Sequence, residues 1–335
     1  MKIIKSNLLG QLNQLKLALA NKDIIEHSNH FAFLGDKIAA YNDDIALSVP
    51  TGINICGAVP AAELIKLLNK LKTDEIDLEI EGGEMLFQSG KMKGGIKFDP
   101  ECKLPLEELG QMKKWRAVPK DFLQAVKTCL FSASKDMSKP KLTCVHVMEN
   151  NVESSDSFRM TRVIIQDAIA FEMLLPAANA QHLVKYDMEK YCKTDGWVHF
   201  KTKENLIFSG RIYLEQYPDL TPFFEIEEPT EIQFPKSLLE SLERAEVFGK
   251  ADIDIDSEIA VKIEDKKITV RGQNDIGWSE ESMKISYTGN PIEFKIHPEQ
   301  FRDVLTRTRI VHIDKGCSRI FFEADGFSHL LALTS

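Results

Sequence analysis

The sequence lacks the features that would place the protein in several common classes. None of its six cysteines forms a CxxC pair, which argues against a zinc site or a disulfide framework and favours a reducing, cytoplasmic compartment. No apolar run approaches the ~20 residues of a membrane span, and the first residues turn polar sooner than a secretory signal would. Basic residues are outnumbered, 42 against 51, giving a net charge of -9. This balance excludes a wholly basic surface but leaves room for a basic patch.

Signals for catalysis are equally sparse. The chain has no GxSxG motif and no P-loop. His27 and His30 have the spacing of metal ligands, but no cluster of further ligands accompanies them, so we interpret them as a surface pair. The stretch "VESSDSFRM" crowds Ser154 and Ser155 against Asp156, but no histidine is close in sequence. We expect the serines on a strand and Asp156 shaping a turn, with a hydrolase using Ser155 and Asp156 as a remote alternative. No catalytic residue, metal site or cofactor is predicted.

What the chain does contain is a repeated pair of amphipathic helices. The first helix of each pair is expected from Ser6, Pro119 and Pro235, where Ser6 suits an N-cap and each proline suits a first helical position. These starts are 113 and 116 residues apart. The second helices are expected from Pro60, Pro176 and Pro298, which are 116 and 122 residues apart. Two landmarks therefore give one period of about a third of the chain.

Between the helices of each pair lies a strand and then a turn containing an aspartate, at Asp43, Asp156 and Asp275. Short stretches that alternate apolar and polar residues follow each second helix and predict further strands. Each unit is therefore α+β, with two helices packed on antiparallel sheet. We predict three tandem domains of one fold, at 1–114, 115–229 and 230–335.

Several of these segments resemble one known family. "SSDSFRM" resembles the TDGHRL stretch of bacterial sliding clamps, the beta subunit of DNA polymerase III, and "SGRIYLEQYPDL" is similar to a segment near the end of that family's middle domain. "KKITVRGQND", "EFKIHPEQFRDVL" and "LGDKIAAYNDDIALSV" are similar to further segments of the family. The resemblance covers the whole chain, and the order and spacing of the segments make it specific.

The resemblance implies a function without catalysis. In that family two three-domain chains close into a ring, duplex DNA passes through it, and the ring holds a polymerase on DNA. We therefore expect a homodimer that binds double-stranded DNA without regard to sequence, in a bacterial cell or, given the chain's divergence, a phage-infected one. Sliding favours weak contacts to phosphates. A scaffold with a clamp-like fold that binds proteins but does not encircle DNA is the alternative.

The distribution of charge agrees with a basic inner surface. Windows around the six expected helices hold 16 Lys and Arg against 9 Asp and Glu, although every window ends on a basic residue, which the helix dipole also favours. The resemblance places Lys22 in a loop that contacts DNA in the family. The other DNA-binding candidates lie on or beside the helices, and their alternative is ordinary solvated charge: Lys66, Lys70, Lys127, Lys185, Arg244, Arg302 and Arg307.

The resemblance also implies a groove that captures short peptides from the polymerase and the clamp loader. Carried over position by position, its walls are Leu142, Ser155, Arg159, Met160, Leu330, Leu331 and Leu333. The sequence departs from the family here, because Ser157 and Phe158 replace its Gly-His and the chain ends in 332–335, "ALTS", rather than Met-Pro-Met-Arg. We expect an altered peptide preference. Alternatively, Leu330 and Leu331 are simply core residues of the last strand.

Overall fold

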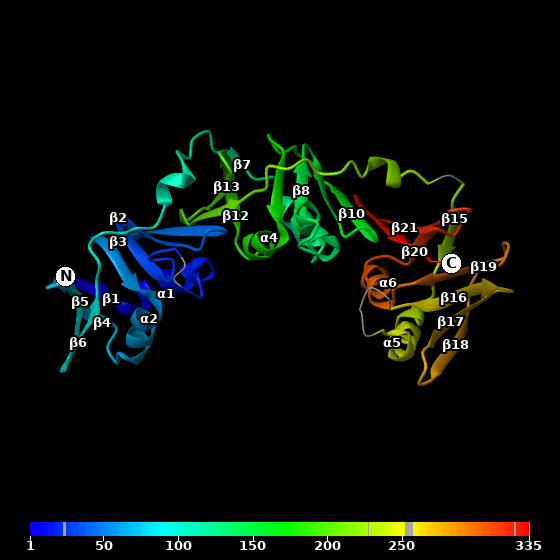
Figure 1. Ribbon diagram of the computed structural model, residues 1–335, viewed down its shortest axis with the longest axis horizontal. Helices are drawn as coiled ribbons and strands as arrows, with labels where there is room; N and C mark the ends of the chain where they lie inside the picture. Colours follow the sequence, from blue (N-terminus) through cyan, green and yellow to red (C-terminus); the bar gives the residue numbers. More distant parts are fainter. Residues whose placement is uncertain (23–24, 227, 252–256, 325, 335) are drawn as a thin grey trace. The chain divides into compact units, whose positions relative to one another are not determined.

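The computed structural model describes residues 1–22, 25–226, 228–251, 257–324 and 326–334. The chain forms two compact units. The first contains Met1–Leu123 and Met173–Leu214, and the second contains Gln124–Glu172 and Glu215–Ser335. Both units mix helices with antiparallel sheets, in agreement with the predicted α+β class (Figure 1). No helix of the described residues is long and apolar enough to cross a membrane.

The first unit is built on a six-stranded sheet whose strands come from distant parts of the chain. The long hairpin of β2 and β3 is extended by β14, with Ser48 of β3 opposite Ile207 of β14. The strand order is β2 (His30–Tyr41), β3 (Ile45–Pro60), β14 (Ile207–Arg211), β13 (Trp197–Thr202), β12 (Met188–Thr194) and β7 (Arg116–Ala117). A smaller sheet contains β1 (Lys2–Ile4), β4 (Glu75–Glu81), β5 (Glu84–Ser89) and β6 (Met92–Lys97).

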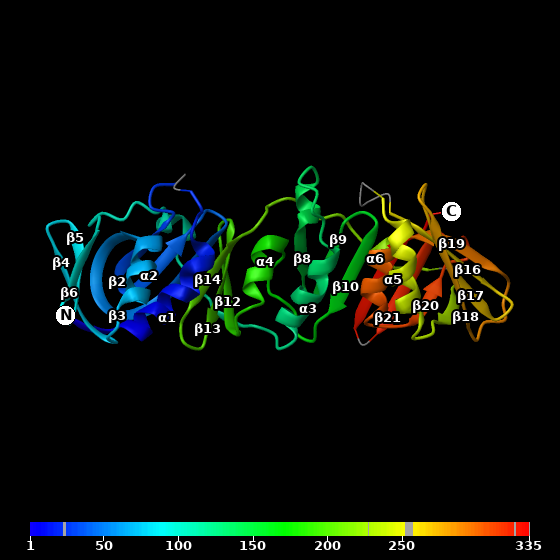
Figure 2. The same ribbon diagram turned by 90° about the horizontal axis from the view of Figure 1, so that it is seen from below.

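The helices of the first unit are α1 (Lys5–Leu15), α2 (Ala61–Lys70) and α4 (Ala177–Leu183). Helix α1 buries Leu8, Leu12 and Leu15, which lie on one face because helical residues three and four apart are neighbours. Helices α1 and α2 lie beside β2 and β3 in both ribbon views (Figures 1 and 2). The short strand β11 (Met173–Pro176) leads into α4, and a 3-10 turn at Leu106–Leu109 precedes β7.

The second unit contains a row of seven antiparallel strands. Their order is β8 (Cys144–Met148), β9 (Asn151–Ser155), β10 (Arg159–Ile164), β22 (Phe327–Ala332), β21 (Arg319–Ala324), β20 (Ile310–Ile313) and β15 (Thr230–Gln233). A four-stranded sheet contains β18 (Trp278–Lys284), β17 (Lys267–Gln273), β16 (Ile259–Glu264) and β19 (Ile292–Ile296). The pairing of β10 with β22 joins two segments that are more than 150 residues apart in the sequence.

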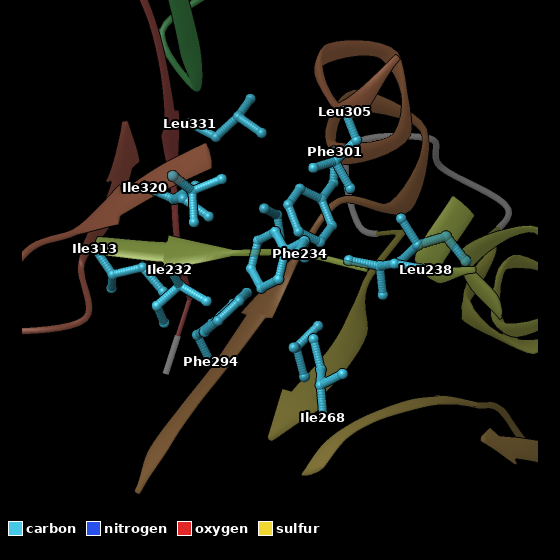
Figure 3. Packing of buried hydrophobic residues seen from close by; sticks show 14 of the residues in the cluster. Ile232, Phe234, Leu238, Ile268, Phe294, Phe301, Leu305, Ile313, Ile320 and Leu331 are labelled. Carbon is cyan, nitrogen blue, oxygen red and sulfur yellow. The ribbon is translucent and has the colours of Figure 1, made fainter. Parts of the chain in front are cut away.

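The helices of the second unit pack on a large core of aliphatic and phenylalanine side chains. Helices α5 (Leu238–Gly249) and α6 (Pro298–Leu305) lie side by side (Figures 1 and 2), and the ring of Phe301 on α6 meets those of Phe234 and Phe294 edge-on, 5.7 and 6.4 Å away (Figure 3). Helix α3 (Phe122–Cys129) begins in the first unit and ends in the second, and a 3-10 turn at Leu130–Ser132 follows it.

Several local predictions are wrong. Ser6 is not an N-cap, because α1 already includes it, and its hydroxyl instead bonds the Asp74 carboxylate at 2.8 Å. Pro119 and Pro235 are not first helical residues, because α3 and α5 begin three residues later and each proline carbonyl accepts a turn hydrogen bond. His27 is not on the surface: it is only 6% exposed, and its Nδ1 accepts the Lys103 backbone N–H at 3.2 Å.

Candidate functional site

A cavity of about 500 Å³ opens on the second unit beside the turn between β9 and β10. Its floor includes Ser155 at the end of β9 and Met160 on β10. One wall is the segment 138–142, which leads into a 3-10 turn at Pro140–Thr143. A second part of the wall comes from the segment before β15 and includes Glu215, Pro218, Leu220 and Phe223. The volume lies within the range of sites that hold a small ligand or a few side chains of a peptide.

The floor of the cavity is held by a turn that Asp156 shapes. Its Oδ1 accepts the backbone N–H groups of Phe158 and Arg159, at 3.0 and 2.9 Å, and its Oδ2 accepts Nε of Arg159 at 2.8 Å. Ser157 takes a positive φ of 82° at this turn. The prediction that Asp156 forms a turn by bonding nearby N–H groups is thus confirmed.

The serines of this stretch are committed to structural hydrogen bonds. Ser154 is fully buried, and its hydroxyl donates to the carbonyl of Cys129 at 2.5 Å. The Ser155 hydroxyl donates to the Arg159 carbonyl at 2.9 Å. Both residues lie on β9, as predicted. Within the described residues, no histidine is placed to take a proton from either hydroxyl, and no cluster of His, Cys, Asp and Glu is arranged to hold a metal ion.

A buried ionic network fixes the wall formed by residues 215–223. His146 on β8 lies between Glu153 and Glu172, with Nδ1 2.9 Å and Nε2 3.0 Å from their carboxylate oxygens. Its ring stacks on Tyr217 at 4.6 Å. Arg162 donates to Glu153 at 2.8 Å.

The same guanidinium extends the network into the wall itself. Arg162 lies over the ring of Phe224 at 4.6 Å and reaches Thr221 Oγ1 at 3.3 Å. A buried carboxylate needs a compensating partner, and Arg162 supplies one to Glu153. The stacking of His146 on Tyr217 and the bond from Arg162 to Thr221 join this loop to strands β8 and β10.

The structure brings three of the seven predicted groove residues together, since Leu142, Ser155 and Met160 all line the cavity. Leu330 and Leu331 lie on the next strand, β22, opposite Met160 and Arg159 respectively. They are 3% and 1% exposed, and Leu331 packs into the core of the second unit (Figure 3).

Leu333 belongs to that same core, and Ser335, the last residue of the divergent C-terminal segment, lies outside the described residues. The backbone N–H of Ala332 donates to the Phe158 carbonyl at 2.8 Å, so the end of the chain is fastened to the turn that carries the cavity floor. The Phe158 side chain itself is 44% exposed.

Arg159 is tied into the protein rather than free in the cavity. Besides its bond to Asp156, its guanidinium lies 3.9 Å from the carboxylate of Asp303 on α6 and 5.5 Å from the ring centre of Phe131. Burial raises the pKa of Asp303, and the charge of Arg159 opposes that rise. Arg159 therefore links the β9–β10 turn to α6, a role that its sequence position alone did not reveal.

Sequence reasoning missed most of the wall formed by residues 215–223. Pro218 and Leu220 lie in an irregular segment, and Phe223 ends a 3-10 helix of only three residues, Thr221–Phe223, which is too short to give a periodic pattern. The sequence carries one signal for this wall, the stretch "SGRIYLEQYPDL", whose last residues include Pro218 and Leu220. Lys139 and Lys141, which line the cavity from segment 138–142, were also missed.

The DNA-binding candidates fall into two groups. Five lysines have exposed side chains, and no carboxylate among the described residues pairs with any of them: Lys22, Lys66, Lys70, Lys127 and Lys185. Lys66 and Lys70 are one helical turn apart on α2, which gives that helix a local positive surface. The Lys185 ammonium lies 3.4 Å from Nδ1 of His182, and all five side chains are exposed enough to meet a phosphate backbone.

The three arginine candidates already have partners. Arg244 makes two bonds to the Glu281 carboxylate, at 2.8 and 3.0 Å, and Arg302 on α6 bonds Glu246 on α5 at 2.6 Å. The Arg307 guanidinium lies 4.9 Å from the ring centre of Phe131. Two of the three charges are therefore compensated within the protein, and they attract an external phosphate less than the lysines do.

Neither a protein-family model nor a curated protein sequence matches the chain. Solved structures do. The DNA polymerase III beta chain of Streptococcus pneumoniae superposes with a TM-score of 0.87 at 19% identity, over 100% of this chain and 99% of that one. The beta subunit of Pseudomonas aeruginosa gives 0.86 at 15%, over 100% and 99%, and the sliding clamp of Bacillus subtilis gives 0.84 at 18%, over 100% and 98%. The chain thus has the fold of the bacterial DNA polymerase sliding clamps along its whole length, which confirms the resemblance predicted from its sequence.

Proposed function

We propose that this protein is a DNA sliding clamp, in which two copies close into a ring around duplex DNA and tether a replicative polymerase and its clamp loader through the cavity on the second unit. The observation that carries this proposal is the likeness in fold to sliding clamps over the full length of both chains.

Three-domain organisation is part of the proposal. Each predicted repeat has a tight turn between two strands that a side-chain amide or carboxylate closes by accepting backbone N–H groups. Asn42 accepts those of Asp44 and Ile45, Asp156 shapes the second turn, and Asn274 accepts those of Ile276 and Gly277. The same device at the same place in each third of the chain supports domains at 1–114, 115–229 and 230–335.

The unpaired lysines support DNA contact. Phosphate contacts from flexible ammonium groups carry no sequence information, and each is weak enough to exchange quickly as a ring moves along DNA. Because the net charge of the chain is -9, contact with DNA needs local positive surface, which unpaired lysines such as these provide. The cavity lined by Leu142 and Met160 supports capture of a peptide by apolar anchors.

The first test is the native mass, measured by light scattering on a sizing column over a dilution series. A ring of two 38.0 kDa chains has a native mass of about 76 kDa, twice that of one chain. A dimer should then remain on closed circular DNA after high-salt washing and be lost when the circle is cut, because retention by topology does not depend on charge. A protein that stays at 38 kDa, or that leaves both DNAs alike, would contradict the ring.

The alternative is a clamp-like scaffold that binds proteins without encircling DNA. Its supporting observation is the compensation of Arg244 and Arg302 by glutamates, which reduces the positive charge available to DNA. The scaffold predicts peptide binding at the cavity by a monomer and equal loss from circular and linear DNA, so the same two measurements separate it from the ring.

A further inference from the structure

A second cavity, of about 280 Å³, lies in the first unit between the six-stranded sheet and the segment that precedes β7. The sheet contributes residues of β2, β3 and β14, and the segment contributes Leu106, Leu109, Gly110 and Met112. Leu109 is buried, and Leu106 and Met112 pack against the same hydrophobic cluster, so burial of apolar surface holds the segment over the sheet. The cavity shares no lining residue with the one beside the β9–β10 turn, so a ligand here is independent of the proposed peptide groove.

The cavity lies at a position where the second unit has two charged side chains. Ala39 comes three residues before, and Ser48 six residues after, the side chain that closes the turn of the first predicted repeat. In the second repeat the same two positions are Glu153 and Arg162, and each pair faces across two neighbouring strands. Glu153 and Arg162 fill their space with an ion pair. Ala39 and Ser48 are too small to do so, and both line the cavity.

One polar group on the buried side of this cavity is left with acceptor capacity only. The Thr194 hydroxyl donates its single proton to the Leu109 carbonyl at 2.8 Å, so Nε2 of His199, also 2.8 Å away, must donate to Thr194. Burial lowers the pKa of His199 to about 4, so the ring is neutral near pH 7 and its Nδ1 accepts. The Ser209 hydroxyl therefore donates to Nδ1, at 2.8 Å, and its oxygen can still accept. Ser209 lines the cavity and is 1% exposed.

The other polar group of the cavity is an exposed cation, Lys37. No ion pair among the described residues involves it. Ser209 pairs with Ala46 on β3, and Lys37 pairs with Pro50 on the same strand. Strand geometry therefore puts the Cα atoms of Lys37 and Ser209 on the order of 15 Å apart, with both side chains on one face of the sheet. The long lysine stem closes part of that distance, and an apolar space remains between an ammonium group and a hydroxyl oxygen.

We propose that this cavity binds a small carboxylic acid that carries a phenolic ring, with its carboxylate on Lys37 and its hydroxyl donating to the Ser209 oxygen. The ring lies among the apolar side chains of Leu106, Leu109 and Met112. Such a ligand has a donor and an anion at opposite ends of an apolar body, which matches an acceptor and a cation at opposite ends of the cavity. The volume is at the lower end of ligand sites, so it admits about one ring and a short chain.

The test is saturation-transfer NMR on the intact protein with three probes of similar size. The first, para-hydroxyphenylpropionate, has both polar groups; phenylpropionate lacks the phenolic hydroxyl, and para-hydroxyphenylpropanol lacks the carboxylate. We expect the hydroxy acid to bind with a dissociation constant on the order of 1 mM, as a ligand of this size allows. Each of the other two should bind about three- to fivefold more weakly, which is the effect of one neutral hydrogen bond or one partly exposed ion pair.

Variants locate the probe. Lys37→Gln should remove the difference between the hydroxy acid and the alcohol, whereas Lys203→Gln, at an exposed lysine outside the cavity, should keep it. Ala46→Met should abolish binding of all three probes, because the larger side chain occupies the cavity from β3. Methionine is the natural residue at the corresponding position of the second repeat, Met160. Ser48→Met blocks the cavity from the same face of β3, and circular dichroism shows which blocking variant folds.

Several outcomes would overturn the site. If the hydroxy acid does not bind, or binds a folded blocking variant as tightly as the natural protein, the cavity is not a ligand site. Equal affinity for the hydroxy acid and the alcohol would remove the role of Lys37, and equal affinity for the hydroxy acid and phenylpropionate would remove that of Ser209. If neither blocking variant folds, the comparison of Lys37→Gln with Lys203→Gln decides. None of these results depends on the native mass or on DNA retention, which test the ring.

Discussion

At the scale of single residues, the stability of the second unit depends on the partners of one buried carboxylate. Glu153 is 4% exposed, and its carboxylate pairs with the Arg162 guanidinium and lies 2.9 Å from Nδ1 of His146. Replacing Arg162 with methionine leaves the carboxylate without its guanidinium, and we expect a loss of about 3–5 kcal/mol in the free energy of unfolding. Urea unfolding followed by circular dichroism measures it. The double variant Arg162→Met with Glu153→Gln should recover part of the loss, and an equal loss in both would argue against the pair.

A second residue in the first unit makes stability depend on pH. His199 is fully buried between the Thr194 and Ser209 hydroxyls, each 2.8 Å away, and burial lowers its pKa to about 4. The unfolded chain protonates this histidine near pH 6.5 whereas the folded protein does not, so its stabilising contribution is complete above pH 6.5 and is lost as the pH falls toward 4.

Between pH 7.5 and pH 5 this one histidine should therefore cost about 2 kcal/mol of stability. The measurement compares urea midpoints at the two pH values for the natural protein and for His199→Gln. The variant should lose less stability on acidification than the natural protein does. His329, whose pKa is also lowered by burial, is present in both proteins and cancels in the comparison.

At the scale of elements, one glycine sets how closely a helix approaches a sheet. A Cβ at Gly272 on β17 would overlap the carbonyl oxygen of Ala245 on α5, so any side chain there must push the helix away. We expect Gly272→Ala to destabilise the protein by about 3 kcal/mol, at the upper end of what overpacking costs. Gly10→Ala is the matched control, because Gly10 lies inside α1 with open space around it and should gain about 0.5–1 kcal/mol. Similar melting temperatures for the two variants would contradict the close approach.

The elements were easier to predict from the sequence than their ends. Apolar residues at helical spacing were sufficient to locate α1, because burial of Leu8 and Leu12 depends on that spacing. Ser6 was wrongly predicted as the N-cap of α1 because its partner, Asp74, is distant in sequence and no local pattern indicates that contact. His27 was misjudged for the same reason, since Lys103 approaches it from a later segment.

In the candidate site too, residues on or beside regular strands were predicted from the sequence, and residues outside them were not. Leu142, Ser155 and Met160 came from regular strands and their flanks, where the resemblance could be followed residue by residue. Pro218 and Phe223 lie in a segment whose only regular element is the 3-10 helix Thr221–Phe223. This segment contacts strands from earlier in the chain, through Tyr217 on His146 and Thr221 on Arg162. Such a path depends on contacts between segments and cannot be obtained from local pattern.

At the scale of the whole molecule, the unpaired lysines should act together on DNA binding. Replacing Lys66 and Lys70 with glutamine removes two possible phosphate contacts from α2, and we expect affinity to fall equally for all DNA sequences. The slope of log K against log salt should lose about 0.9 for each contact removed. Titrations at several salt concentrations measure it, with Lys203→Gln and Lys267→Gln as the control of equal charge. An unchanged slope would remove α2 from the DNA-binding surface.

The sheet of the first unit also bears on how the protein is made. Strand β3 pairs with β14, and Ser48 meets a partner, Ile207, that lies about 160 residues further along the chain. A ribosome that adds ~5–20 residues per second releases β14 on the order of ten to thirty seconds after β3. During that interval β3 presents an unpaired edge to the crowded cytosol, where another nascent chain could pair with it. Slow translation should therefore lower the yield of folded protein, and a chaperone that covers exposed strand edges should restore it.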